Sequence, residues 1–187
     1  MYETSDIRKG LKIQIDGVPF AVVDFQFVKP GKGVAFTRTK LRNMMTGAVI
    51  ERTYRSGEKF EPANLEERQM QFIYVENNMF VFMDTATYDQ IQLSEEQLGD
   101  NRYYMKDGIM VNVLLFDQKA IGVTPPNFVE LKVVSTEPGF KGDTSSGGTK
   151  PATLETGLEV NVPLFINQGE TLRIDTRTAS YTERVKK

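Results

Sequence analysis

The 187-residue sequence contains no cysteine, no histidine and no tryptophan. Without cysteine the chain can form neither a disulfide framework nor a thiolate nucleophile. Without histidine it lacks the commonest general base near neutral pH and the commonest metal ligand. The adjacent carboxylates Glu66 and Glu67, and likewise Glu95 and Glu96, point apart in regular structure and are typical of solvated faces. We therefore expect no enzyme, no catalytic residue, no metal site and no cofactor.

Long hydrophobic segments are absent as well. No stretch approaches the roughly 18 to 20 apolar residues of a membrane-spanning helix. The opening MYETSDIRKG has no apolar run behind a basic start and therefore does not resemble a signal peptide. Hydrophobic residues make up 40% of the chain and charged residues 26%, which is ordinary for a soluble protein with a core of its own. We expect a cytoplasmic protein with no membrane partner.

Charge is distributed unevenly, although the net charge is only −2. Residues 1–61 hold 11 Lys and Arg against 7 Asp and Glu, whereas residues 62–129 hold 4 against 10. Residues 130–187 are balanced, with 8 of each sign. The local field matters more than the net charge when a partner touches one end of a molecule. The basic first third is thus the part suited to a polyanion.

Short apolar or alternating runs, bounded by Gly, Asn, Asp and Pro, dominate the sequence, and helical periodicity is nearly missing. This pattern predicts hairpins that turn at Asp16-Gly17, Thr46-Gly47 and Asn77-Asn78. The predicted strands before residue 60 cover 11–15, 18–28, 34–42 and 48–55. Short strands that recur about every 8 to 12 residues, with turn residues between them, predict small sandwiches or barrels.

One short segment, SEEQLG at 94–99, resembles a helix. Ser94 can cap the free amides of the first turn, and Gln97 can reach back to the amide of Ser94. Gly99 supplies the stop signal.

An internal repeat indicates duplication. GIMVNVLLF at 108–116 and GLEVNVPLF at 157–165 agree at six of nine positions. We interpret the middle and last thirds as copies of one small barrel, and the first third as a separate barrel with a long hairpin. Candidate linkers lie at EPAN and TPPNF, the latter stiffened by two prolines. The sequence predicts three domains: residues 1–63, an acidic domain 64–128, and residues 129–187.

The segment KPGK at 29–32 places a lysine at each corner of a tight turn. Pro at the second position and Gly at the third are the signature of a type II turn, in which Gly supplies the positive φ. Lys29 and Lys32 would then lie at the first and last corners of the turn, at the tip of a stiff arm, and Gly33 gives further backbone freedom. Lysine is also common at solvated hairpin tips, so a turn that merely closes a barrel remains the alternative.

Three cations follow the tip at alternate positions. Arg38, Lys40 and Arg42 share one face of the returning strand because successive side chains of a strand point to opposite faces. Such a basic stripe is suited to a phosphate backbone.

Two further segments are candidate RNA contacts. The loop GFKGDTSSGGTK at 139–150 offers backbone amides and hydroxyls, although it lacks the Gly-Lys-Ser/Thr of a phosphate-binding loop and equally suits a mobile surface loop. The ending SYTERVKK at 180–187 combines Tyr181 with three cations, Arg184 among them, and equally suits a solubilising tail.

Together these segments resemble bacterial translation elongation factor P. KPGKGVAF at 29–36 is similar to the family's domain I hairpin, and GDT at 142–144 to its domain III loop. KPATLETGLEVNVPLFINQGE at 150–170 resembles the family's signature segment, and SYTERV its usual ending. The similarity covers the whole chain, and the tip and the signature segment are highly specific in combination. The elongation-factor-P-like paralogues differ from this chain at both the tip and the GDT motif.

The resemblance implies an all-β protein with three small β-barrel domains, one KOW/SH3-like and two OB-fold-like, in an L-shaped arrangement that mimics tRNA. It also implies binding to the 70S ribosome between the P and E sites and relief of stalling at consecutive prolines. Lys32 matches the position that a lysine-modifying enzyme extends with a β-lysyl or aminopentanol-type group, so that it reaches the CCA end of the P-site peptidyl-tRNA. Rhamnosylation would need an arginine there. By the same resemblance, the flanking Lys29, Pro30, Gly31 and Gly33 would shape the tip that presents Lys32.

By the same resemblance, Gly142, Asp143 and Thr144 match the loop that contacts the mRNA codon in the E site. Tyr181 and Arg184 match C-terminal positions that face RNA. We expect a monomer. Three alternatives stay open: an elongation-factor-P-like paralogue, a non-ribosomal RNA-binding β-barrel protein, and a protein-interaction module that uses the acidic middle third.

Overall fold

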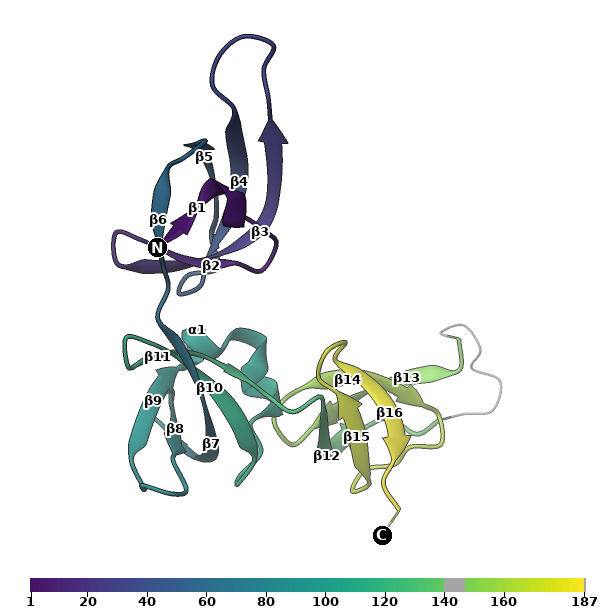
Figure 1. Ribbon diagram of the computed structural model, residues 1–187. Helices are drawn as coiled ribbons and strands as arrows, with labels where there is room; N and C mark the ends of the chain where they lie inside the picture. Colours follow the sequence, from purple (N-terminus) through teal and green to yellow (C-terminus); the bar gives the residue numbers. More distant parts are fainter. Residues whose placement is uncertain (140–146, 187) are drawn as a thin grey trace. The chain divides into compact units, whose positions relative to one another are not determined.

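The computed structural model describes residues 1–139 and 147–186, and strands dominate it (Figure 1). These residues form three β-sheets, one of six strands and two of five. The expected all-β class with three small sheet domains is confirmed. The L-shaped arrangement and the predicted domain limits of 1–63, 64–128 and 129–187 stay predictions.

The first sheet has the strand order β1-β6-β2-β3-β4-β5. Its strands are β1 (Tyr2–Glu3), β2 (Lys12–Ile15), β3 (Val18–Val28), β4 (Phe36–Asn43), β5 (Val49–Arg55) and β6 (Lys59–Pro62). A short 3-10 helix, η1 (Thr4–Asp6), follows β1. Each predicted hairpin of this region is present, because the turn residues stand where the alternating pattern breaks.

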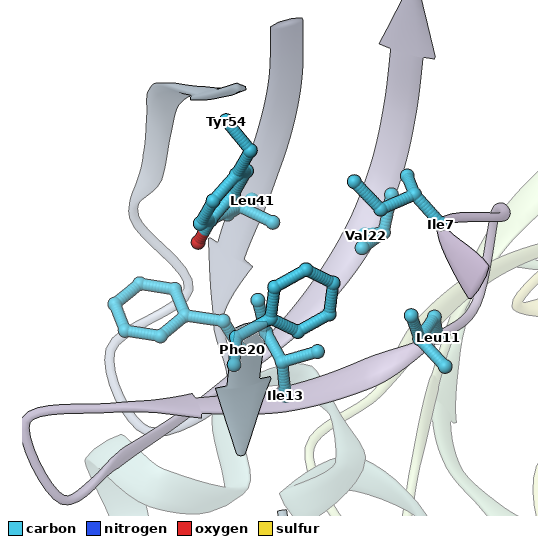
Figure 2. Packing of buried hydrophobic residues seen from close by; sticks show 8 residues of the cluster. Ile7, Leu11, Ile13, Phe20, Val22, Leu41 and Tyr54 are labelled. Carbon is cyan, nitrogen blue, oxygen red and sulfur yellow. The ribbon is translucent and has the colours of Figure 1, made fainter. Parts of the chain in front are cut away.

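The core of this sheet is one apolar cluster, most of which Figure 2 shows from close by. Its members come from alternate positions of the strands and from the segment before β2. They are Ile7, Leu11, Ile13, Phe20, Val22, Leu41, Tyr54 and Phe60. Tyr54 and Phe60 pack as a tilted ring pair with centroids 5.1 Å apart. Burial of these side chains holds the base of the β3–β4 hairpin in place.

The second sheet has the order β11-β10-β7-β8-β9. Its strands are β7 (Leu65–Glu76), β8 (Met79–Met83), β9 (Gln90–Ser94), β10 (Met110–Phe116) and β11 (Lys119–Thr124). The predicted hairpin at Asn77 and Asn78 joins β7 to β8, and both asparagines have a positive φ. Such a φ suits a two-residue turn whose twist matches that of the strands.

The predicted helix follows β9 as α1 (Glu95–Leu98). The Ser94 hydroxyl accepts a hydrogen bond from the Gln97 amide, and the Gln97 side chain accepts one from the Ser94 amide. Gly99 ends the helix with a φ of 56°. The 3-10 helix η2 (Gly99–Tyr104), like η1, was not predicted, since so short an element leaves no periodic signal.

The third sheet has the order β14-β13-β12-β15-β16. Its strands are β12 (Phe128–Thr136), β13 (Thr149–Leu154), β14 (Glu159–Pro163), β15 (Thr171–Asp175) and β16 (Ser180–Arg184). The two end strands, β14 and β16, also contact each other, which brings this sheet close to a closed barrel.

The second and third sheets share one topology. In each, the first three strands pair in sequence, the fourth pairs with the first, and the fifth pairs with the fourth. The segments that suggested a duplication are nevertheless not equivalent. The first contains β10, a fourth strand, and the second contains β14, a third strand. The agreement of the two segments therefore does not mark a shared position in the fold.

Candidate functional site

The β3–β4 hairpin carries the tip. The two strands pair from Phe20 and Asn43 up to Val28 and Phe36, and residues 29–35 connect them. Figure 1 shows this hairpin extending beyond the other strands of the first sheet. A long two-stranded arm with its tip at the far end is what the sequence predicted.

The conformation of the tip differs from the prediction. A type II turn at 29–32 requires a positive φ at Gly31, but only Gly33 in this loop has one, at 109°. The connection is seven residues long, and the chain bends over residues 31–33. The reversal is thus spread over a longer loop, and the left-handed position that glycine favours is shifted to Gly33. Pro30 lies 3.9 Å from the position that a Gly33 Cβ would occupy.

Both lysines of the tip are exposed. Within the described residues, neither Lys29 nor Lys32 has an ion pair or hydrogen bond. A long flexible stem that ends in a free ammonium can reach into a polar cleft, and its amine can be extended covalently. Lys32 is therefore available to an external partner.

The basic stripe lies on the exposed face of β4. Arg38, Lys40 and Arg42 are exposed and alternate with the buried Thr37, Thr39 and Leu41. The shared face that the sequence predicted is thus present.

The neighbours of these three cations differ. Lys40 lies between Asp24 of β3 and Glu51 of β5, whereas Arg38 lies between Gln26 and Thr53. Asp24 also pairs with Lys9 at 3.2 Å. The hydrogen bond from Lys9 holds the pKa of Asp24 below its usual range, and Lys40 adds a smaller effect of the same sign. The positive field of the stripe is thus partly neutralised at Lys40 and retained at Arg38.

The register across β4 and β5 adds one cation that the sequence analysis missed. Arg55 lies directly opposite Phe36, and a hollow of about 580 Å³ is lined by Val34, Phe36, Arg38, Thr53 and Arg55. Arg38 also stacks on the ring of Phe36, with its guanidinium 5.5 Å from the ring centroid. Only the strand pairing could reveal Arg55, because it stands 17 positions away from Arg38 in the sequence.

The remaining predicted contacts lie apart from the tip in the chain. Arg184 donates to Glu170 at 3.0 Å and stacks on Phe165, so part of its hydrogen-bonding capacity is used within its own sheet. Tyr181 is half-buried beside Ile174. Gly142, Asp143 and Thr144 lie outside the described residues.

Two negative findings apply to residues 1–139 and 147–186. No group of three or more Asp or Glu side chains is placed to hold a metal ion. No helix in these ranges has the length and apolarity to cross a membrane.

Sequence comparison places each third of the chain in one family. The family model "Elongation factor P (EF-P) KOW-like domain" matches residues 3–60, and "Elongation factor P (EF-P) OB domain" matches residues 65–123. "Elongation factor P, C-terminal" matches residues 129–184. The chain belongs to the elongation factor P family.

Full-length relatives agree with this membership. "Elongation factor P 2" of Geobacter sulfurreducens is 54% identical over 186 residues and aligns over 100% of both chains. "Elongation factor P" of Pelotomaculum thermopropionicum is 56% identical over 185 residues, covering 99% of this chain and 100% of the relative. The family resemblance inferred from the tip and the signature segment is confirmed.

Solved structures add evidence on the fold. "Eukaryotic translation initiation factor 5A from Methanococcus jannaschii" superimposes with a TM-score of 0.58 at 23% identity, over 66% of this chain and 91% of that one. An initiation factor 5A family protein from Naegleria fowleri gives a TM-score of 0.51 at 15% identity, with coverages of 66% and 94%. About two thirds of this chain therefore shares its fold with these two proteins.

Proposed function

We propose that this chain is a translation elongation factor that binds the 70S ribosome between the P and E sites. There it promotes peptide bond formation at consecutive prolines by holding the peptidyl-tRNA in a reactive position. The observation that carries the proposal is the exposed amine of Lys32, which has no partner among the described residues and stands in the loop that ends the β3–β4 hairpin. Membership of the elongation factor P family supports it.

The mechanism follows from geometry rather than from acid–base chemistry. Proline is a poor nucleophile and constrains the nascent chain, so alignment of the reacting ends limits the rate. A factor that holds these ends in position removes part of the entropic cost of bringing them together, and it needs no catalytic group of its own. Lys32, extended by a lysine-modifying enzyme, lies beside the CCA end in this proposal.

The rest of the interface orients the arm. Arg38, Lys40 and Arg42 contact tRNA phosphates, and each neutralised phosphate releases counterions. Gly142, Asp143 and Thr144 contact the E-site codon. Tyr181 and Arg184 contact RNA near the C-terminus. Arg184 has five guanidinium N–H donors, so its bond to Glu170 leaves donors for a second partner.

The decisive variant is Lys32→Ala. Because Lys32 has no partner within the described residues, the variant should unfold at the wild-type temperature. It should nevertheless lose the relief of stalling on a reporter that encodes three consecutive prolines. Synthesis of that reporter in a reconstituted translation system, with and without the factor, measures this loss.

Lys29→Ala is the matched control, since Lys29 is an exposed lysine of the same loop. We expect it to retain most of the activity. Equal reporter synthesis with wild type and with Lys32→Ala would contradict the proposal. Binding of free RNA without co-sedimentation with ribosomes would instead favour a non-ribosomal RNA-binding protein.

A further inference from the structure

Arg184 of β16 is held by two side chains from the loop that joins β14 to β15, residues 164–170. Its Nη1 donates to Glu170 Oε1 at 3.0 Å, and its guanidinium lies over the ring of Phe165, 5.4 Å from the ring centroid. The carboxylate and the ring both restrict the orientation of the guanidinium. Glu170 takes one of its five N–H groups, so the others remain for an external acceptor.

Glu170 is itself held in place by the loop. Its Oε2 accepts a hydrogen bond from the Asn167 amide at 2.9 Å, so both carboxylate oxygens have donors. The backbone of the loop is bound to β12, because Val133 donates to the Glu170 carbonyl and accepts from the Gly169 amide, each at 2.9 Å. Ile166 of the same loop is fully buried. Glu170 is therefore a fixed acceptor for Arg184.

The third sheet contains a second set of the same three residue types. Arg173 donates to Glu183 at 2.9 Å, and its guanidinium lies over Phe128, 5.1 Å from the ring centroid. Glu183 lies directly across from Arg173 on β16, and no second donor reaches its carboxylate within the described residues. The Glu183 side chain is 58% exposed, whereas that of Glu170 is 28% exposed. The two sets share their chemistry and differ in whether the carboxylate is fixed.

A fixed Arg–Glu pair suits contact at short range. The pair has no net charge, so it attracts a distant phosphate only weakly. At contact the guanidinium offers N–H donors in a rigid plane, and bidentate recognition of a phosphate requires this geometry. An arginine that is held before binding also loses less side-chain entropy in the complex.

We propose that Glu170 is a positioning residue that orients Arg184 toward a phosphate of ribosomal RNA, with the ring of Phe165 supporting the guanidinium. This inference rests on the C-terminal RNA contact of the proposed function and adds the residues that position it. The pair of Arg173 and Glu183 lacks a fixed carboxylate, and exposed pairs of this kind contribute little.

The test compares Glu170→Gln with Glu183→Gln, since each removes one carboxylate charge from an Arg–Glu pair. Glutamine replaces one accepting oxygen by an NH2 group, so either Arg184 or the Asn167 amide loses its acceptor. Glu170→Gln should weaken co-sedimentation with 70S ribosomes about fivefold, the value of one well-placed hydrogen bond. Loss of a negative charge by itself has the opposite sign, because it strengthens binding to RNA. Glu183→Gln should therefore bind at wild-type affinity or slightly more tightly.

A double-mutant cycle shows whether Glu170 acts through Arg184. In an Arg184→Gln chain, Glu170→Gln should cause no further loss of affinity, whereas a substitution that merely disrupts the loop weakens binding in both backgrounds. Hydroxyl-radical footprinting should show that Glu170→Gln and Arg184→Gln lose protection at the same nucleotides of ribosomal RNA. Thermal unfolding of each variant monitors the fold.

Four results would overturn the inference while wild type still binds ribosomes. They are wild-type or higher affinity in Glu170→Gln, an equal loss in Glu183→Gln, an equal loss in both backgrounds of the cycle, and weaker binding with unchanged RNA protection. The last result would assign Arg184 to a ribosomal protein instead. A wild-type chain that does not bind ribosomes would overturn the proposed function and this inference together.

Discussion

The hydroxyl of Tyr54 is buried in the core of the first sheet and has no hydrogen-bond partner among the described residues. A buried hydroxyl that loses its water and gains no partner destabilises the folded state. The ring itself packs against Phe60 and under the guanidinium of Arg52. At this position the aromatic ring is stabilising and the oxygen is not.

Tyr54→Phe should therefore raise the free energy of unfolding by about 1 kcal/mol, since it keeps the ring and removes the unpaired oxygen. Denaturant unfolding of the two proteins at neutral pH measures the difference. A lower free energy of unfolding in the variant would show that the Tyr54 hydroxyl has a hydrogen-bond partner in solution.

The same residue makes a prediction about pH. Burial raises the pKa of Tyr54 above its ordinary value of 10.0. Once the pH exceeds 10.0, the unfolded chain loses the phenolic proton of Tyr54 while the folded chain still keeps it. The free energy of unfolding therefore falls as the pH rises. Tyr54→Phe should show a shallower fall. Some slope should remain, because burial also raises the pKa of Tyr104.

Among the elements, α1 is the clearest case of a local signal that decides a structure. It is four residues long, and reciprocal hydrogen bonds between Ser94 and Gln97 close its first turn. A helix of one turn has almost no intrinsic stability, so the cap and the burial of Leu98 maintain it.

Ser94→Ala should lower the free energy of unfolding by about 1 kcal/mol, because the Gln97 amide loses its acceptor. Chemical denaturation of the full chain tests this. Ser94→Asp is the control, since aspartate is an equally good N-cap. A loss of equal size in Ser94→Asp would mean that the hydroxyl acts through packing rather than through the cap.

At the scale of the whole molecule, the basic first third and the acidic middle third predict binding that depends on salt. The strand register adds a ranking within the basic stripe. Arg38 has no acid directly across on either neighbouring strand, whereas Lys40 has Asp24 and Glu51. Arg38 should therefore contribute more to the attraction of phosphates.

We expect Arg38→Gln to weaken ribosome binding more than Lys40→Gln does, and to reduce the slope of log affinity against log salt by about 1. Co-sedimentation over about 50 to 200 mM salt measures both quantities. A larger effect of Lys40→Gln would mean that the acids beside it are displaced in the complex.

Much of the candidate site could be predicted because its signals are local. The hairpin, the exposed tip lysines and the alternating cations depend on residues a few positions apart, and each was found where expected. The turn type was wrong, since it assumed a four-residue turn where the strands leave a loop of seven. The exposure of Phe25 and Phe27 could not be predicted, because an alternating strand pattern gives no indication of where the core ends.

The sequence by itself determined the class of the fold, the positions of most turns, the helix cap and the family to which the chain belongs. These follow from side-chain alternation, turn residues and short motifs, all of which act over a few residues. Only the tertiary structure decided which strands are neighbours. Strand pairing joins residues that are distant in the sequence. It thereby placed acids beside Lys40 but not Arg38, added Arg55 to the basic face and left Phe25 and Phe27 partly exposed.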